Sequence, residues 1–106
     1  MNTPMTLVRI YLSEADQGKK HNLLDEIMDV LHDQHKVHGV TVFRGIAGFG
    51  SKGQMHSADL LRLTTRLPLV VEFYDAPAAV EAALQSLNGL VPANHVISWP
   101  VDCQGV

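Results

Sequence analysis

The residues best suited to binding chemistry lie in a glycine-rich stretch in the middle of the chain, between Arg44 and Arg62. Half of the 8 glycines of the protein fall there, as Gly45, Gly48, Gly50 and Gly53 with Lys52 among them. Glycine leaves the backbone exposed, and successive free N–H groups can form a nest that binds an anion. One interpretation is therefore a phosphate- or carboxylate-binding loop. The other is a bulged hairpin whose glycines serve only twist and bending, and the residues favour neither.

Residues 48–53 also match the dinucleotide-binding pattern G-x-G-x-x-G. That pattern requires a strand before it and a long helix that opens directly at its last glycine. Here the pattern follows the second predicted strand rather than the first, and at most a short helix follows it. The sequence therefore argues against a Rossmann-type site.

Histidine is unusually frequent, with 6 in 106 residues. His32, His35 and His38 step by three, which places neighbours about 60° apart on a helix, where they could share a metal ion. Alternatively, they form a solvated last helical turn, where a protonated imidazole is favoured by the helix dipole. Because no carboxylate or thiol lies at a diagnostic spacing, we favour the second interpretation and assign no metal ligand. His21 and His95 are expected at the surface or in caps.

Four other residues could contribute to a site. Glu14 and Asp16 follow the first predicted strand, where they either bind a ribose hydroxyl or cap the next helix, and we favour the cap. Cys103 has no basic neighbour that would lower its pKa and is not expected to be reactive. Trp99 is expected in an oligomer interface or the core rather than as a stacking platform.

Hydrophobic spacing predicts the elements that must position these residues. Strand-like segments cover residues 7–12, 40–43, 67–73 and 95–101, and helical periodicity covers 20–38 and the segment from Pro77 to Asn88. Gly39 is expected to end the first helix as a left-handed cap residue, and Asp75 to cap the second. Pro100 indicates an edge strand or a strand end.

The order of these elements is β-α-β-β-α-β, which predicts an α+β, ferredoxin-like fold. Right-handed crossovers would place both helices on one face of a four-stranded antiparallel sheet. The other face would be open and would carry apolar residues. An apolar face of this size usually finds a partner, so we expect a homo-oligomer, either a trimer or a dimer.

Composition limits the remaining possibilities. A chain of 106 residues has room for one domain, which we expect to span residues 1–106. The formal net charge of −3 argues against a nucleic-acid partner. One cysteine excludes an internal disulfide, and neither a signal peptide nor a membrane span is recognisable, so we expect a cytoplasmic protein.

Several separated blocks resemble the bacterial and archaeal family called domain of unknown function 190. They are residues 9–14 (RIYLSE), 44–50 (RGIAGFG), 55–63 (MHSADLLRL) and 67–72 (LPLVVE), and the similarity covers about residues 6–90. The resemblance implies a PII-like protein, similar to the trimeric nitrogen-regulatory PII signalling proteins. In that family an adenine nucleotide lies in the cleft between subunits, and a long T-loop reports its identity to a target.

The resemblance also implies which residues form the site. Gly48, Gly50, Ser51 and Lys52 would contact the nucleotide at the base of the loop, while His56 and Arg62 would lie on or beside it. The same blocks contain the remaining candidates for ligand binding, Arg44, Gly45 and Phe49.

The sequence departs from PII in the connection before the last strand, residues 88–95. This segment contains no Lys or Arg, whereas PII has a glycine-rich phosphate loop with a lysine there. AMP or a cyclic nucleotide is therefore expected more than ATP.

Partners and alternatives follow from the same resemblance. Some relatives are encoded beside, or fused to, fluoride-exporter channels, which implies a membrane transporter or channel as partner. A metal-responsive trimer similar to divalent-cation tolerance proteins is an alternative that depends on the histidines. A small ferredoxin-like enzyme is another, but no titratable pair is assembled by spacing, and we expect no enzymatic activity.

Overall fold

The computed structural model describes residues 2–49, 55–57 and 67–105. Its elements in chain order are β1 (Asn2–Ser13), α1 (Leu23–Asp29), the short π-helix η1 (Val30–Gln34), β2 (Val40–Arg44), β3 (Ala47–Phe49), β4 (Met55–Ser57), β5 (Pro68–Asp75), α2 (Pro77–Leu87) and β6 (Val96–Gln104). Among the described residues, no helix is long and apolar enough to cross a membrane.

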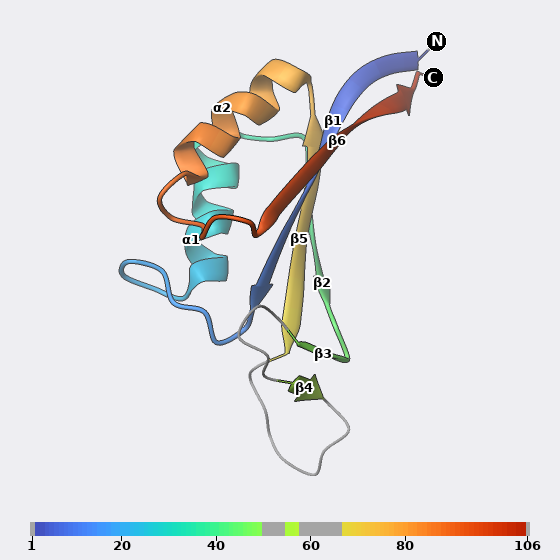
Figure 1. Ribbon diagram of the computed structural model, residues 1–106. Coiled ribbons are helices and arrows are strands. Elements are labelled where there is room, and N and C mark those ends of the chain that lie inside the picture. The colour runs from blue at the N-terminus through green and yellow to red at the C-terminus, as the bar shows by residue number, and fades with distance from the viewer. Residues whose placement is uncertain (1, 50–54, 58–66, 106) are drawn as a thin grey trace.

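Four strands form an antiparallel sheet in the order β2-β5-β1-β6. Both helices cover the same face of this sheet (Figure 1). The predicted ferredoxin-like arrangement is therefore confirmed. Strands β3 and β4 form a separate two-stranded hairpin within the connection from β2 to β5, which the sequence did not predict as strands.

The core lies between the sheet and the helices. Along β1 and β5 every second residue is buried, which gives Val8, Ile10 and Leu12 on β1, and Leu69, Val71 and Phe73 on β5. This alternation is the period of a strand with one covered face. The helices contribute Leu23, Ile27, Val80, Ala83 and Leu87 to the same core.

The first helical segment is shorter than predicted. The predicted helix covers residues 20–38, but α1 begins at Leu23, where the side chain of Asn22 accepts a hydrogen bond from the Asp25 N–H. The preceding N–H groups of Lys20 and His21 donate instead to the carboxylate of Glu26, which holds them in a turn.

The end of this segment also differs from the prediction. The α-helix continues as the wider π-helix η1, in which the His35 N–H donates to the Val30 carbonyl. The helical turns end at Gln34. The left-handed conformation belongs to Lys36, with φ of 50°, and Gly39 has no positive φ. The prediction that Gly39 is the left-handed cap was therefore wrong, because the helix ends before that residue.

The second helix begins and ends close to the predicted positions. Pro77 occupies its first turn, and Gly89 follows its end with φ of 87°. Asp75 does not cap α2, since Ala76 is the N-cap residue and makes no side-chain hydrogen bond there. The carboxylate of Asp75 instead accepts from the His38 N–H at 2.9 Å and from the Ala76 N–H at 2.7 Å.

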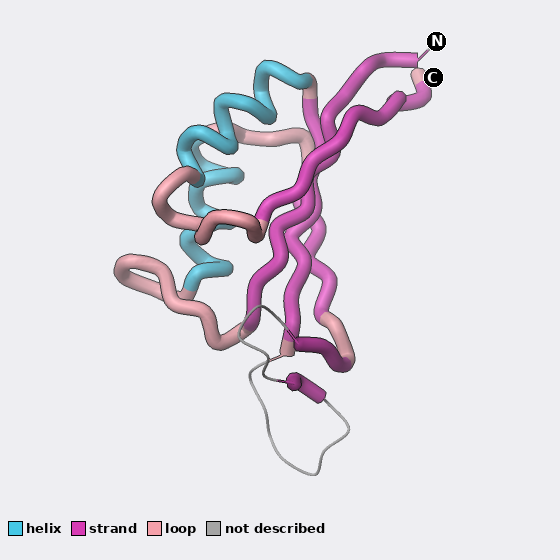
Figure 2. The backbone as a smooth tube through the Cα atoms, in the orientation of Figure 1, coloured by secondary structure: helices cyan, strands magenta, loops and turns pink. Residues whose placement is uncertain are grey.

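The first and last strands of the chain are longer than predicted. Strand β1 begins at Asn2 rather than residue 7, and β6 continues to Gln104, because the two strands pair along this whole length from Asn2 opposite Gln104. The two ends of the chain consequently lie side by side at one end of the sheet (Figure 2). Strand β6 pairs with β1 alone, so Pro100 lies on an edge strand, as predicted.

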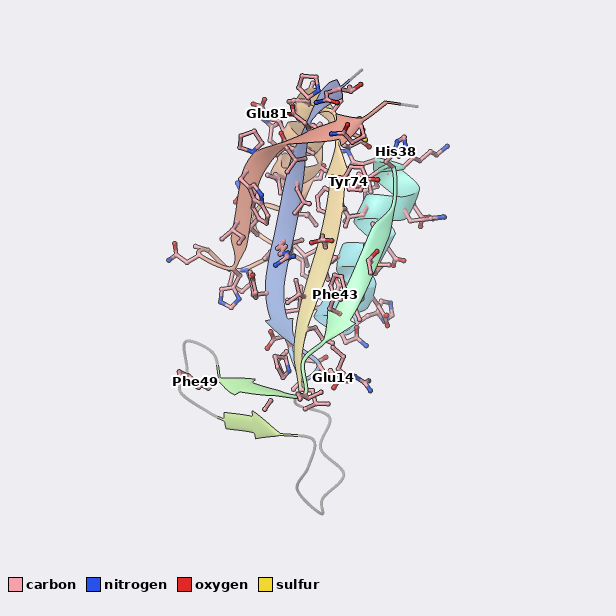
Figure 3. All side chains as sticks on the ribbon, turned by 90° about the vertical axis from the view of Figure 1, so that its right-hand side faces the viewer. Glu14, His38, Phe43, Phe49, Tyr74 and Glu81 are labelled. Atoms are coloured by element: carbon pink, nitrogen blue, oxygen red, sulfur yellow. The ribbon has the colours of Figure 1, made fainter. Side chains whose placement is uncertain are left out.

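The face opposite the helices is open and largely apolar, as the sequence predicts. It carries large side chains that are between 38% and 48% exposed: Tyr11, Phe43, Tyr74, Ile97 and Trp99. These residues belong to all four strands, and Figure 3 looks onto the face that they form, with Phe43 and Tyr74 labelled. Trp99 lies on this face and is not a core residue.

Candidate functional site: the base of the loop between β2 and β5

Three strand ends meet where the connection between β2 and β5 begins and ends. Arg44, the last residue of β2, pairs with Leu69, and Ser13, the last residue of β1, pairs with Pro68. The connection therefore leaves and rejoins the sheet at the end opposite the chain termini (Figure 1). We call this meeting point the loop base, and it consists of Ser13, Glu14, Arg44, Gly45 and residues 67–69.

The first two glycines of the cluster lie close to Pro68. The Gly45 N–H donates to the Pro68 carbonyl at 2.7 Å, so this amide is already satisfied. A Cβ on Gly45 would lie 2.7 Å from the Pro68 Cγ, and one on Gly48 would lie 3.4 Å from the same atom. A side chain at Gly45 would force the proline ring to move. Gly45 therefore permits close packing of the connection against β5, whereas a Cβ at Gly48 would make an ordinary van der Waals contact.

The predicted ligand-binding residues are only partly visible. Gly50, Ser51, Lys52 and Arg62 lie outside the described residues. The backbone of His56 is described, and it pairs with Gly48 in the β3–β4 hairpin. The assignment of these residues to a ligand therefore stays a prediction.

The described part of the hairpin presents apolar side chains to solvent. Ile46 is 81% exposed and Phe49 is 71% exposed, which is far more than the side chains of the open sheet face. Phe49 lies on β3, beyond the end of the four-stranded sheet (Figure 3). Two large hydrophobic side chains, Ile46 just before β3 and Phe49 on it, are thus exposed to solvent.

Arg44 forms an ion pair that the sequence did not reveal. Its Nη2 donates to the Glu14 Oε2 at 2.6 Å, and the side chains of Arg44 and Glu14 are 64% and 17% exposed. The second carboxylate oxygen, Glu14 Oε1, is buried and accepts no hydrogen bond from any described residue. In addition, the Glu14 N–H donates to the Leu67 carbonyl at 3.0 Å. Glu14 therefore contacts the residues at both ends of the connection.

The prediction that Glu14 and Asp16 cap the first helix was wrong. Asp16 Oδ2 accepts from the Ser13 N–H at 2.9 Å, which closes the turn after β1, and Asn22 is the residue that caps α1. Sequence spacing missed the role of Glu14 because its partner lies 30 residues away. The polar composition of 13–18 shows only that a turn is present.

The three spaced histidines each contact a different group. His32 Nδ1 lies 2.7 Å from the Asp33 carboxylate, His35 Nε2 lies 2.6 Å from the Ser86 hydroxyl, and the His38 ring lies against Tyr74 at a centroid distance of 6.3 Å. Within the described ranges, no three His, Cys, Asp or Glu side chains are grouped as a metal site requires.

A second polar arrangement lies at the centre of the open sheet face. Arg9 Nε donates to the Glu72 Oε1 at 2.8 Å, and the guanidinium lies 5.7 Å from the Trp99 ring centroid. The hydrogen bond to Glu72 raises the pKa of Arg9 above its ordinary value, so this side chain stays charged. The cation lies over the aromatic ring at a distance that favours a cation–π interaction.

A groove of about 560 Å³ lies between α2, the connection after it, and β6. Val80, Leu84 and Val96 contribute to its apolar lining, and Glu81 is the one charged side chain among the described residues that line it. This groove includes part of residues 88–95, the segment that lacks Lys and Arg. It therefore provides no cation for a phosphate group.

The chain is similar to known proteins in both sequence and structure. The chain matches the model of the family called domain of unknown function 190, described as Uncharacterized ACR, over residues 5–103. A UPF0166 protein of Methanocaldococcus jannaschii is 30% identical over 91 residues, which cover 86% of this chain and 82% of that protein.

Solved structures with a similar fold include two of different kinds. One is CPII, a nitrogen regulatory PII-like protein from Thiomonas intermedia K12 bound to ADP, AMP and bicarbonate, with a TM-score of 0.68 and 18% identity over 97% of this chain and 91% of that chain. The other is the divalent ion tolerance protein CutA1 from Ehrlichia chaffeensis, with a TM-score of 0.58 and 10% identity over 96% and 83% of the respective chains. At these identities the similarity concerns the fold.

Proposed function

Because the chain belongs to the family called domain of unknown function 190 and shares the fold of PII-like proteins, we propose that it is a PII-like regulatory protein that binds an adenine nucleotide and has no enzymatic activity. The similarity to CPII carries this proposal, since it extends over 97% of the chain. The structure of CPII contains ADP, AMP and bicarbonate. A small anion of this class is the ligand that the proposal assigns to this chain.

The loop base supports the proposal because it holds an exposed cation, Arg44, where the sequence predicts ligand binding. Arg44 is 64% exposed at the start of the glycine-rich stretch. A guanidinium has five N–H donors, and toward the described residues the Arg44 side chain uses one of them, in its hydrogen bond to Glu14, so donors remain for a ligand. The nucleotide would contact Arg44 together with the residues that follow on the loop, Gly48, Phe49, Gly50, Ser51, Lys52, His56 and Arg62.

AMP or a cyclic nucleotide fits this site better than ATP. A triphosphate requires several cations, but the connection after α2 has none, and Glu81 is negative in the groove beside it. Arg44 is already paired with a carboxylate. The less negative nucleotides therefore bind with less uncompensated charge.

The open sheet face supports an assembly of several copies, which we take to be a trimer acting in the cytoplasm. Its five large side chains are each more than a third exposed in the isolated chain. Burying them against neighbouring copies would create clefts between subunits, where the nucleotide would lie. The loop around residues 51–62 would then signal the bound state to a partner, and the implied partner is a membrane transporter or channel.

Native mass spectrometry and calorimetry test this function together. The freshly purified protein is expected to have the mass of a trimer and to carry a small molecule of nucleotide mass. Titration with AMP, cyclic AMP, ADP and ATP is expected to give the strongest binding for one of the first two, with GMP as the control for base recognition. A monomer that gives no heat with any adenine nucleotide contradicts the proposal.

A further inference from the structure

The Glu14–Arg44 ion pair is asymmetric in its burial. The Glu14 side chain is 17% exposed and its Oε1 is buried, whereas the Arg44 side chain is 64% exposed. Withdrawing Arg44 would leave a mostly buried carboxylate without a countercharge, which is costly. The ion pair is therefore costly to break, and Glu14 is expected to keep Arg44 as its partner when a ligand binds.

The backbone of Glu14 fixes this carboxylate in position. Its N–H donates to the Leu67 carbonyl at 3.0 Å, and the preceding Ser13 is held by pairing with Pro68 and by its hydrogen bond to Asp16. The carboxylate thus belongs to the end of a paired strand and not to a free turn. This arrangement holds the negative charge of Glu14 at a fixed position beside the exposed guanidinium of Arg44.

We propose that Glu14 determines the charge selectivity of the loop base, because its carboxylate neutralises Arg44 and disfavours ligands with more negative charge. The proposal deepens the function given above and rests on it. An anion that accepts a hydrogen bond from Arg44 must lie near the Glu14 carboxylate as well. Each further negative charge on the ligand adds repulsion from Glu14, and this repulsion offsets the added attraction to Arg44. Glu14 is a specificity-determining residue in this account.

The variant Glu14→Gln separates charge from shape, since the amide has nearly the same size and keeps an oxygen for Arg44. Calorimetric titration of both proteins with AMP, ADP and ATP, in that order of increasing charge, measures the selectivity. The gain in affinity from E14Q is expected to grow along this series, by roughly threefold for each added charge near a protein surface. A gain that is the same for all three nucleotides, or no gain, overturns the proposal.

Asp102→Asn provides the matched control, since it removes the same charge far from the loop base. Asp102 pairs with Pro4 at the other end of β1, which lies roughly 30 Å from Ser13 at the usual rise of a strand. This variant is expected to leave the ratios between the three nucleotides unchanged. If D102N changes the ratios as much as E14Q does, the effect reflects net charge and the proposal fails.

A measurement on the unmodified protein keeps the proposal testable even if E14Q does not fold. Raising the salt concentration screens the repulsion from Glu14, so the affinity gap between AMP and ATP is expected to narrow. A gap that widens with salt indicates net attraction of charge at the site and contradicts the proposal. If no nucleotide binds to any of these proteins, both this proposal and the proposed function fail, whereas binding with unchanged ratios in E14Q removes only this one.

Discussion

Glu26 shows how a single carboxylate can organise the turn before a helix. Its Oε2 accepts hydrogen bonds from the His21 N–H at 2.9 Å and the Lys20 N–H at 3.1 Å. These bonds, that from His21 foremost, lower the pKa of Glu26 below its ordinary value of 4.5. A carboxyl whose pKa is depressed on folding stabilises the fold above its ordinary pKa. That contribution disappears as the pH falls through the lower pKa of the folded state.

The variant Glu26→Gln tests this linkage. At neutral pH the variant is expected to melt at a lower temperature than the unmodified protein, because a neutral amide is a weaker acceptor than a carboxylate. As the pH is lowered below the ordinary range of glutamate, the difference between the two melting temperatures is expected to shrink. Thermal unfolding followed by circular dichroism at several pH values measures it.

Asp29→Asn is the control for this experiment. Asp29 lies at the end of α1, is exposed, and makes no side-chain hydrogen bond to a described residue. Its substitution changes the same charge without removing an acceptor of backbone N–H groups. A melting difference for E26Q that is independent of pH, or one that D29N reproduces, contradicts the role assigned to Glu26.

The roles of individual residues were predictable from the sequence only where the partner is local. Pro77 at the start of α2 and Gly89 after its end follow from neighbouring residues, and the structure confirms both. The pair of Glu14 and Arg44 forms only because β1 and β2 both end beside the first residues of β5, which no short motif records. The sequence therefore identified Arg44 as a candidate but did not identify Glu14 as its ion-pair partner.

At the scale of elements, hydrophobic spacing predicted α2 and the four strands of the main sheet, but it missed β3 and β4 and misjudged the ends of the first helix. Val30 and Leu31 are both buried where the α-helix gives way to the wider turns of η1. Periodicity continued through this change and predicted a helix as far as residue 38. The left-handed conformation of Lys36 then ends the segment, although glycine is the residue expected at such a position.

Two glycine substitutions distinguish the observed helix ends from the predicted ones. Gly89→Ala is expected to destabilise the protein by about 1 kcal/mol, because Gly89 has φ of 87° and alanine avoids that region. Gly39→Ala is expected to leave the stability unchanged or to raise it by ~0.5 kcal/mol through the unfolded state, since its φ is not positive and nothing lies within 4 Å of the added Cβ. Denaturation in urea measures both. An equal loss in the two variants contradicts the assignment of a left-handed conformation to Gly89 and not to Gly39.

At the scale of the whole molecule, the two faces of the sheet differ in how they are completed. Helices α1 and α2 cover one face, and the residues that they bury form the core. The other face exposes aromatic and aliphatic side chains from all four strands around the Arg9–Glu72 pair. In that ion pair, Glu72 on β5 neutralises Arg9 on β1. The face could therefore be buried against other copies without leaving that charge unpaired.

The variant Phe43→Glu tests whether this face holds copies of the chain together. Phe43 is 48% exposed on β2 and lies opposite Val70, two positions along β5 from Glu72. Because Phe43 is half exposed, the substitution is expected to leave the monomer folded, with an unchanged circular dichroism spectrum. Within an interface, however, it would bury an unpaired carboxylate. Native mass spectrometry is therefore expected to detect a monomer for this variant and the proposed trimer for the unmodified protein.

Ala82→Glu places the same new charge on the opposite side of the molecule, since Ala82 is an exposed residue of α2. It is expected to preserve the mass of the assembly, because α2 lies on the covered face of the sheet (Figure 1). If A82E dissociates the assembly and F43E does not, the subunits meet through the helices and the open face has another occupant. If both variants remain assembled, neither face carries the interface. The nucleotide then does not bind in clefts formed when the open face is buried against neighbouring subunits.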